Sequence, residues 1–558
     1  MVSLASLGQW VLTLALLGGY ETVSAATTQQ WKSRSIYQTM TDRFALPAGT
    51  TAAACNTTAG LYCGGTWRGT IDKLDYIQGM GFDAVMISPI IQNIDGRASY
   101  GEAYHGYWPD DLYSLNSRFG THQDLLDLSS AVHARGMYLM MDTVINNMAY
   151  MTNGKNPATN IDYSALTPFN SSSYYHSYCE ISNWNNYTQA QLCQTGDEIV
   201  ALPDLYTEHE DVQNMLVDWA TQMISTYSID GLRIDAAKSV NPSFLTTFHD
   251  RVGTFMTGEV FEQNASIVCD YQDNYLPSLP NFPLYYTILD AFTRGNPSAL
   301  FQRIALVQEL CNDVPAMPTF IENHDVDRFA FANDDLTLAK NAIVFEMLYD
   351  GIPWVYQGQE QHLNGSYAGT HNREALWEYG YDTSSTLYTL ISKLNRVRKH
   401  AYTLDPEYIE MQTIPLYQGG SELAFWKGAF GRQVVMLLST QGSTGSSYNV
   451  TLPMTYGAGI EVVEVLNCVN YTVNDYSQLI VPMDKGEPRV FFPVTLMPGS
   501  GLCGYGSNTT SLSHLRLSAA AAALGSAASP TVAQVSGGLV AMITLLSSLL
   551  LVQFGVWF

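Results

Sequence analysis

Short, continuous apolar runs recur along residues 27–405, and stretches with helical spacing of apolar positions separate them. Apolar runs that end in polar residues are typical of parallel strands buried on both faces. The repeated strand–helix alternation therefore predicts an α/β protein built on a (β/α)8 TIM barrel. The strand-like runs are 84–87, 137–141, 231–234, 255–260, 317–321 and 352–356, and the clearest helical stretches are 125–135, 212–227 and 336–348.

This alternation is interrupted at residues 148–204, which are rich in Asn, Tyr, Ser and Thr. We expect an irregular inserted domain B here, after the third strand, so that the barrel comprises residues 27–147 and 205–405. Beyond residue 405 the pattern changes to short strands such as 434–439, separated by Gly and Ser turns. That change predicts a separate C-terminal all-β sandwich domain over residues 406–505.

Both ends of the chain have the composition of processing signals. Residues 1–26 hold an apolar run followed by small residues, which predicts a secretory signal peptide. A Ser/Ala-rich stalk (506–536) leads to an apolar tail (537–558), and small residues around Gly525 and Ser526 precede that tail. This order predicts a GPI anchor attached near residue 525. The alternative is a plain transmembrane helix, but no basic stop-transfer cluster follows the tail.

The charge balance limits the partners of the chain. It has 558 residues, of which 26 are Lys or Arg and 51 are Asp or Glu, giving a net charge of −25. Such an acidic chain repels phosphate backbones, so we expect no nucleic-acid partner. Hydrophobic residues make up 46% of the chain, which is enough for a packed core, and no feature implies an obligate protein partner.

Cysteine usage agrees with secretion. The chain has eight cysteines, and their even number favours four disulfides, with sequential pairing the simplest of many connectivities. N-x-S/T sequons, the acceptors of N-glycans, also occur eight times. The cysteines are Cys55, Cys63, Cys179, Cys193, Cys269, Cys311, Cys468 and Cys503, and the sequon asparagines are Asn56, Asn170, Asn186, Asn264, Asn364, Asn449, Asn470 and Asn508.

Three acidic residues fall at the ends of strand-like runs: Asp235, Glu259 and Asp325. A carboxylate at the carboxyl end of a barrel strand faces the active-site mouth. Retaining glycoside hydrolysis requires a carboxylate nucleophile and a protonated acid, and a third carboxylate can stabilise the charge that develops on the sugar. Arg233 lies two residues before Asp235, on the same strand face, where it can hold that carboxylate ionised. One such acid alone is more typical of an ion pair, whereas three in succession indicate glycosidase chemistry.

Several motifs carry a resemblance to the α-amylase family of glycoside hydrolases. Over about residues 30–505 the chain is most similar to the secreted fungal members, including their layout of four cysteine pairs. The GPI signal resembles the fungal cell-wall-associated branch, which includes GPI-anchored 4-α-glucanotransferases. The motifs are DTVINN (142–147), GLRIDAAK (231–238), GEVF (258–261) and FIENHD (320–325), with YHGYW (104–108), LPDL (202–205) and GQEQH (358–362) in support.

The resemblance implies a role for each matching residue. Asp235 would be the nucleophile, Glu259 the general acid and base, and Asp325 the residue that stabilises the oxocarbenium-like transition state. Lys238 would contact the acceptor side and Arg373 the donor side. The full set of implied substrate-binding residues is Tyr107, His105, Trp108, Asn147, Arg233, Lys238, His324 and Arg373.

The resemblance also implies a Ca2+ cofactor that ties the inserted domain to the barrel. Asn146 and Asp204 occupy ligand positions, and oxygen ligands suit this hard cation. Gln191 stands where an acidic ligand is expected, and Ser239 lies between the acceptor contacts and the calcium shell. Gln191 can still offer a carbonyl oxygen, at the loss of one negative charge.

Three departures from the family pattern fall among sugar-binding positions rather than among the acids. Hydrolytic relatives carry His where this chain has Asn147 and Ser239, and commonly Asp where it has Gly369. The covalent step should therefore survive, while the partition between water and sugar acceptors shifts.

We accordingly expect a retaining enzyme that transfers segments of α-1,4-glucans or maltooligosaccharides, with weak hydrolysis, in fungal cell-wall glucan metabolism. It would be held at the outer face of the plasma membrane or in the wall by its GPI anchor. The alternatives are a GPI-anchored hydrolytic α-amylase and an inactive glucan-binding wall protein. The intact acids argue against the last of these.

Overall fold

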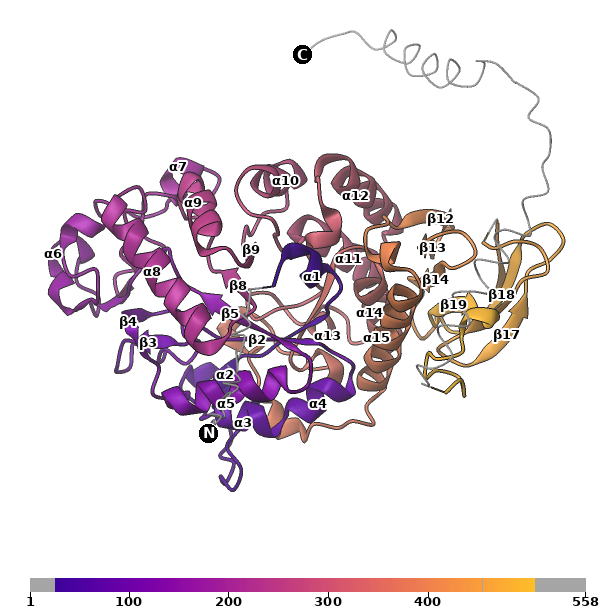
Figure 1. Ribbon diagram of the computed structural model, residues 1–558, viewed down its shortest axis with the longest axis horizontal. Helices are drawn as coiled ribbons and strands as arrows, with labels where there is room; N and C mark the ends of the chain where they lie inside the picture. The colour runs from indigo at the N-terminus through magenta and orange to yellow at the C-terminus, as the bar shows by residue number, and fades with distance from the viewer. Residues whose placement is uncertain (1–25, 454, 507–558) are drawn as a thin grey trace, which may run out of the picture. The chain divides into compact units, whose positions relative to one another are not determined.

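The computed structural model describes residues 26–453 and 455–506, and a seven-stranded parallel sheet forms a barrel wall within them (Figure 1). The spatial order of these strands is β10-β11-β1-β2-β5-β8-β9. The predicted α/β barrel is thereby confirmed. The wall strands are β1 (Ile36–Gln38), β2 (Ala84–Ile87), β5 (Tyr138–Thr143), β8 (Gly231–Ile234), β9 (Phe255–Gly258), β10 (Pro318–Thr319) and β11 (Ile352–Tyr356).

The eighth position of the wall, between β9 and β10, is filled by an irregular segment around Ser278. Ser278 forms a single parallel bridge with Thr257 of β9, and its carbonyl accepts a 3.0 Å hydrogen bond from the Gly258 amide. Pro277 and Pro280 flank Ser278 and have no N–H group, so a continuous ladder cannot form here. The barrel therefore has eight positions, of which seven are regular strands in the described part of the chain.

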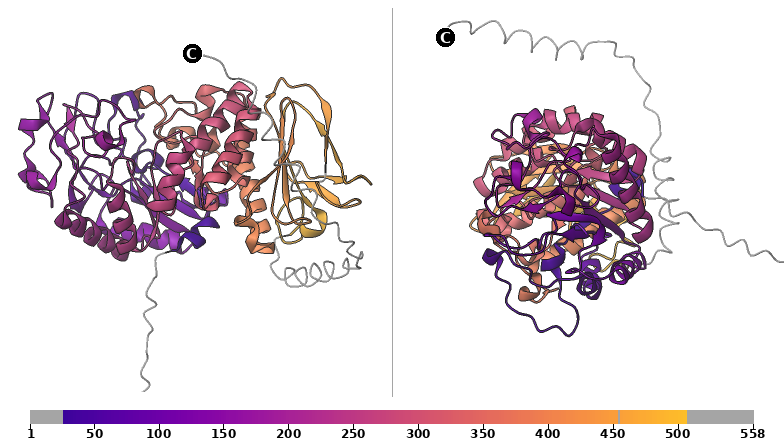
Figure 2. Two further views of the ribbon diagram at one scale, coloured as in Figure 1. Left: turned by 90° about the horizontal axis from the view of Figure 1, so that it is seen from above. Right: turned by 90° about the vertical axis from the view of Figure 1, so that its left-hand side faces the viewer.

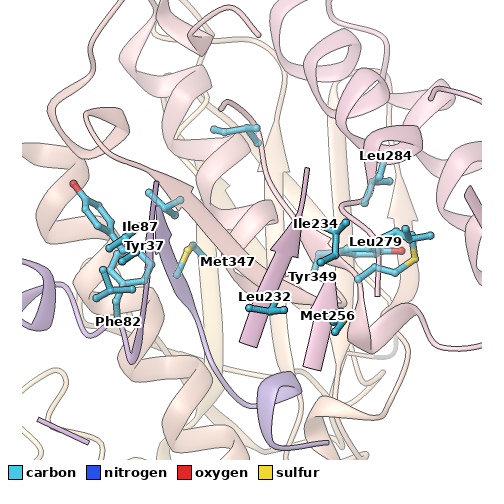
Figure 3. Close-up of a cluster of buried hydrophobic side chains, with 14 of the residues drawn as sticks. Tyr37, Phe82, Ile87, Leu232, Ile234, Met256, Leu279, Leu284, Met347 and Tyr349 are labelled. Atoms are coloured by element: carbon cyan, nitrogen blue, oxygen red, sulfur yellow. The ribbon is translucent and has the colours of Figure 1, made fainter. Parts of the chain in front are cut away.

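Side-chain alternation along the strands separates the barrel interior from the layer under the helices. Leu232 and Ile234 of β8 and Met256 of β9 belong to the main core cluster (Figure 3). Arg233 lies between the first two in sequence and so points the other way, into the barrel. Its register partner on the neighbouring strand β5 is Asp142. One short apolar run thus places both a core pair and a charged interior residue.

A second core cluster fills the amino end of the barrel. It contains Met140 of β5, Phe255 of β9 and Trp354 of β11, together with Trp31 of the first helix. The Trp31 indole donates a 3.0 Å hydrogen bond to the Asp230 carbonyl and closes this end. Because this end is packed, the open and polar end of the barrel is the carboxyl end, where the three predicted acids follow their strands.

Helices surround the sheet, and the three predicted helical stretches correspond to α5, α8 and α14 (Figure 1). The apolar helix α14 is buried on every side because it packs on both β11 and β14. The α-helices are α1 (Thr28–Lys32), α2 (Thr41–Phe44), α3 (Trp67–Asp72), α4 (Leu74–Gly79), α5 (His122–His133), α6 (Pro157–Asn160), α7 (Tyr187–Ala190), α8 (Glu210–Tyr227), α9 (Pro242–Val252), α10 (Ala265–Asn274), α11 (Phe282–Arg294), α12 (Pro297–Leu310), α13 (Phe329–Ala332), α14 (Leu336–Leu348) and α15 (Thr386–Leu404).

The segment between β5 and α8 is irregular, as predicted, with two short helices (α6 and α7) and a two-stranded ladder of β6 (Tyr150–Met151) and β7 (Val200–Ala201). Its two ends meet at the barrel, where Asn147 forms a bridge with Asp204. A further hairpin of β3 (Ile91–Asn93) and β4 (Pro109–Leu115) follows the second wall strand.

The C-terminal domain is a sandwich of a six-stranded antiparallel sheet and a two-stranded one (Figure 2). Val435 and Leu437 face the cluster between the two sheets, whereas Met436 and Leu438 join the barrel core, so the large sheet is apolar on both faces. The large sheet has the order β12 (Ile414–Gln418), β13 (Glu422–Lys427), β14 (Val434–Ser439), β19 (Arg489–Pro493), β16 (Glu461–Glu464), β17 (Val469–Thr472), and the small one pairs β15 (Tyr448–Leu452) with β18 (Leu479–Met483).

The predicted disulfides form in sequential order: Cys55–Cys63, Cys179–Cys193, Cys269–Cys311 and Cys468–Cys503. The asparagines of the seven sequons within the described residues are all exposed. The predicted signal peptide (except Ala26), stalk (except Gly506), Asn508, anchor site at Gly525 and Ser526, and apolar tail lie outside the described residues. Within them, no helix combines the length and apolar character that spanning a bilayer requires.

Candidate active site

One guanidinium group connects the carboxylates at the carboxyl end of the barrel. Arg233 of β8 places Nη1 2.7 Å from Asp235 Oδ1 and Nη2 2.8 Å from Glu259 Oε1. Nη1 also lies 2.9 Å from Oδ1 of Asp142. Asp235 directly follows β8 and Glu259 directly follows β9, so neighbouring strands deliver both acids to one buried cation.

Asp142 begins the DTVINN motif (142–147), and no feature of the sequence singles it out as a site residue. It is 1% exposed, it accepts from Arg233, and its Oδ2 accepts a 2.6 Å hydrogen bond from the Tyr107 hydroxyl. Asp142 thus balances the charge of Arg233 and fixes the ring of Tyr107, which lines the open cleft at this end of the barrel.

The surroundings of the Asp235 and Glu259 carboxyl groups favour the protonated form of this pair. Burial raises the pKa of Asp235 to about 8, against the opposing effect of Arg233. Burial also raises the pKa of Glu259, with Arg233 opposing and the Asp325 carboxylate adding to the rise. Burial of two carboxyls that share one guanidinium therefore favours retention of a proton by one of them. Acid catalysis of leaving-group departure requires such a proton.

Asp325 is held in the opposite state. Burial alone would raise its pKa, but the His324 imidazole and the Arg373 guanidinium bring it well below its usual range. His324 Nε2 lies 2.9 Å from Asp325 Oδ2, and Arg373 Nη2 lies 2.9 Å from Oδ1. The site thus combines a permanently ionised carboxylate with a pair that carries a proton.

His324 is fixed on three sides. Its Nε2 also lies 2.9 Å from the Tyr107 hydroxyl, and the two rings stack at 5.5 Å. Its Nδ1 lies 2.8 Å from Nε2 of Gln38, a buried residue at the end of β1. Gln38 could not be predicted from the sequence, because the three-residue strand that carries it is too short to recognise from an apolar run.

An open cleft of about 630 Å³ lies above these groups. Most predicted binding residues line it or contact those that do, but Asn147 is absent from the lining. Its buried side chain donates to the Met148 carbonyl at 3.3 Å. The cleft is lined by His105, Tyr107, Trp108, Trp184, Thr195, Leu202, Asp235, Ala236, Lys238, Ser239, Glu259, Phe261, Asp325, Tyr367 and Arg373.

Three large aromatic side chains in this lining were not predicted: Trp184, Phe261 and Tyr367. They are 50%, 41% and 48% exposed, which is unusual for side chains of this size. Each lies in a loop, outside the strand and helix patterns from which the acids were found. Exposed aromatic rings beside a polar site are suitable platforms for the apolar faces of sugar rings.

Lys238, on the predicted acceptor side, is held by a short network. Its Nζ lies 3.1 Å from Glu262 Oε2 and 4.9 Å from the ring centre of Tyr187 in the inserted domain. The Tyr187 hydroxyl donates to the same carboxylate oxygen at 2.7 Å. Hydrogen bonds from these partners and from the Asn264 amide outweigh burial and lower the pKa of Glu262. The inserted domain is thus tied to the barrel at the rim of the cleft.

The predicted calcium residues fit a hard cation in part. Oδ2 of Asp204 accepts from His176 Nδ1 at 2.7 Å, while Oδ1 is buried without a hydrogen-bond partner. The Asn146 amide faces this carboxylate, whose pKa burial raises to about 7. An unpaired buried carboxylate oxygen beside a side-chain amide suits Ca2+. Gln191 instead donates to the Tyr271 hydroxyl at 3.3 Å, and Ser239 lines the cleft.

Among the described residues, no group of three or more His, Cys, Asp or Glu side chains is placed to hold a metal ion. A calcium ion at this position would therefore depend on amide and carbonyl oxygens in addition to Asp204.

Comparison with known proteins gives long matches on both sides of residue 405. Residues 36–391 match the family description "Alpha amylase, catalytic domain", and residues 415–511 match "Alpha-amylase, domain C". "Alpha-amylase 2" of Schwanniomyces occidentalis is 44% identical over 478 residues, which cover 85% of this chain and 93% of the relative. "Alpha-amylase" of Saccharomycopsis fibuligera is 44% identical over 467 residues, which cover 83% and 92%.

A solved structure of an α-amylase from Malbranchea cinnamomea superposes with a TM-score of 0.82 at 45% identity, and the match covers 86% of this chain and all of that one. The similarity therefore extends over the barrel, the inserted segment and the C-terminal sandwich together.

Proposed function

The chain belongs to the α-amylase family of glycoside hydrolases, and from that membership we propose that it cleaves α-1,4-glucans with retention and passes the released segment mainly to a sugar acceptor. Asp235, Glu259 and Asp325 supply the acid set for the cleavage. The observation that carries the preference for transfer is the set of half-exposed aromatic rings in a cleft whose lining does not include Asn147.

In the first step the Asp235 carboxylate attacks the anomeric carbon, the glycosidic C–O bond breaks, and Glu259 gives its proton to the departing oxygen. Because burial raises the pKa of Glu259, this carboxyl group retains the proton that it donates. Arg233 bonds both carboxyls, so it stabilises Asp235 as the negative partner when the proton is on Glu259. The ionised carboxylate of Asp325 stabilises the positive charge that develops on the sugar ring.

In the second step a hydroxyl group attacks the same carbon, the ester bond to Asp235 breaks, and Glu259 takes the proton of the attacking hydroxyl. Water gives hydrolysis, whereas the 4-hydroxyl of another glucan gives transfer. A preference of tenfold between them corresponds to only about 1.4 kcal/mol. Small changes in how acceptors bind therefore decide the product.

Two features support transfer. Asn147 donates to the Met148 carbonyl, so it leaves the donor sugar without the stabilising contact that His would make in hydrolytic relatives. Trp184 and Phe261 line the cleft together with Lys238, and can hold an acceptor sugar by its apolar face. A bound acceptor can use this binding energy to lower the barrier of the second step, whereas water cannot.

Hydrolysis is the second candidate, because the relatives that match most of this chain are named α-amylases. The two functions are separated by incubation with a maltooligosaccharide of a single length. Transfer predicts both longer and shorter α-1,4 products, with little gain in reducing ends. Shorter products alone, each with a new reducing end at every substrate concentration, would establish hydrolysis and contradict transfer.

We also propose that Asn146 and Asp204 hold a Ca2+ ion that stabilises the junction between the inserted domain and the barrel. The unpaired Asp204 oxygen supports this role. The ion would act on the fold rather than in the reaction, since the three acids supply the chemistry.

The proposed location is the outer face of the plasma membrane or the cell wall, with attachment through a GPI anchor near Gly525. Four disulfides and exposed sequon asparagines support an extracellular protein. Release of active enzyme by a phosphatidylinositol-specific phospholipase would test the anchor. Detection of Phe558 on the mature chain would contradict it.

A further inference from the structure

A second hollow, of about 600 Å³, lies in the inserted domain next to the catalytic cleft. Its walls come mainly from Glu180, Ile181 and Trp184 on one segment and from residues 194–199 on another, with Gly154 beside them. The Cys179–Cys193 disulfide and a bridge between Glu180 and Gln194 hold these two segments side by side. The hollow is therefore a built feature of the inserted domain, although most of its walls are loops.

The hollow adjoins the cleft. Trp184 and Thr195 line both of them, so these residues form the boundary that the two spaces share. Trp184 is 50% exposed. A ligand that extends from the cleft past Trp184 would therefore reach the hollow next.

The lining combines an aromatic face with fixed polar groups. Gln194 is buried, and its Oε1 accepts a 3.1 Å hydrogen bond from the Leu202 amide, which fixes the wall of the hollow at this point. The Asp197 carboxylate is held in place by the Ile199 amide at 2.7 Å. An apolar ring surface and exposed carboxylate acceptors are groups that recognise a sugar ring, with its apolar face and its many hydroxyls.

A metal ion is a poorer occupant. The lining holds the carboxylates of Glu180, Asp197 and Glu198, but no cluster of three or more acidic, His or Cys side chains within the described residues is placed to hold a metal. Tyr178 already donates to Glu180 at 2.6 Å, and Tyr100 donates to Asp197 at 3.1 Å. Internal donors thus satisfy two of the three carboxylates.

We propose that this hollow is an extension of the substrate cleft that binds the far end of a long α-1,4-glucan and so selects for chain length. The inference rests on the proposed glucan substrate. Each of the two spaces has the volume of an ordinary small-molecule site, so a short oligosaccharide fills the cleft alone and only a longer chain reaches the hollow.

Filling the hollow without touching the cleft tests this extension. Glu198 lines the hollow, is exposed and is absent from the cleft lining, so Glu198→Trp should fold normally and occlude the hollow. The matched control is Glu461→Trp, at an exposed position on β16 of the C-terminal domain. The assay compares kcat/KM for amylose with kcat/KM for maltotetraose, with melting temperature as the measure of folding.

We expect Glu198→Trp to lower kcat/KM for amylose by about tenfold, which corresponds to a loss of about 1.4 kcal/mol of binding. The value of kcat/KM for maltotetraose should stay within about twofold of that of the wild type. Trp184→Ala should lower kcat/KM for amylose at least as much, while Glu461→Trp should leave kcat/KM for both substrates unchanged. Equal values for Glu198→Trp and wild type on amylose, or equal losses on both substrates, would overturn the extension while leaving the proposed function intact. A wild-type enzyme that cleaves neither substrate would overturn both proposals.

Discussion

Replacing Asp142 by Asn tests whether the charges around one guanidinium set the protonation of the catalytic pair. Asp142 and Asp235 lie 2.9 Å and 2.7 Å from the same nitrogen of Arg233, so their nearest oxygens are no more than about 6 Å apart. At an effective dielectric constant of about 20, a unit charge at about 6 Å contributes about 2.8 kcal/mol, or about two pKa units.

The sign follows from the charge that is lost. Asp142 is negative and opposes ionisation of Asp235 and Glu259, and it contributes to the raised pKa of each. Removing the charge makes both acids ionise more easily, so both pKa values fall. The alkaline limb of the pH profile of kcat/KM reports loss of the proton from the acid in the free enzyme. We expect it to move to lower pH by about one to two units, since Arg233 remains and screens part of the change.

The control separates charge from hydrogen bonding. Asp142→Asn also weakens the 2.6 Å hydrogen bond from the Tyr107 hydroxyl, and Tyr107→Phe removes that bond without changing the charge. The assay is kcat/KM on one maltooligosaccharide from about pH 4 to pH 9 for the wild type and both variants. A folded Asp142→Asn enzyme whose alkaline limb coincides with that of Tyr107→Phe would refute the electrostatic reasoning.

Four further outcomes are expected. Asp235→Asn should lower turnover by about 10⁴-fold or more without lowering the melting temperature, because an amide cannot form the glycosyl ester, and wild-type turnover in the pure variant would exclude Asp235 as nucleophile. Chelation should lower the melting temperature by withdrawing a ligand of the native state, and Gln191→Glu should tighten calcium binding; an unchanged melting temperature in metal-free protein argues against a structural ion. Asn147→His combined with Ser239→His should raise the ratio of hydrolysis to transfer, and an unchanged ratio would place the determinant elsewhere. Truncation at about residue 520 should release active enzyme into the medium, and a cell-bound truncated enzyme would contradict the anchor.

Much of the fold follows from apolar runs because burial on both faces of a parallel sheet leaves a strong signal. The run at 231–234 corresponds to β8 without error, and the stretch at 336–348 corresponds to α14. The pattern failed where elements are short or depend on proline. The first wall strand has three residues, and Pro277 and Pro280 replace the eighth strand by an irregular segment.

The candidate site could be predicted only where chemistry follows a strand directly. Asp235 and Glu259 stand immediately after their strands, so position along the chain indicated them as candidates, and the family resemblance supplied their roles. Gln38 and Asp142 act through contacts with His324 and Arg233, which form only when distant strands become neighbours. The domain boundaries, glycosylation sites and anchor site stay predictions.

Among the cleft walls, Trp184, Phe261 and Tyr367 lie in loops without periodicity. Their exposure depends on how those loops fold back over the barrel, and an apolar residue in a loop is otherwise indistinguishable from one that is buried. The same limit applies to Asn147, whose hydrogen bond to the next carbonyl depends on local backbone geometry.

The fate of the glycosyl-enzyme on Asp235 is the most direct test of transfer over hydrolysis. α-Maltosyl fluoride forms this ester with loss of fluoride, and fluoride needs little help from a general acid. Peptide mapping of the rapidly quenched Glu259→Gln enzyme should locate the ester on Asp235. With the wild type, added maltotriose should raise the steady rate of fluoride release by about tenfold and convert most maltosyl units to longer α-1,4 chains. A rate that maltotriose leaves unchanged, with free maltose as the product, would contradict transfer and identify the enzyme as a hydrolytic α-amylase.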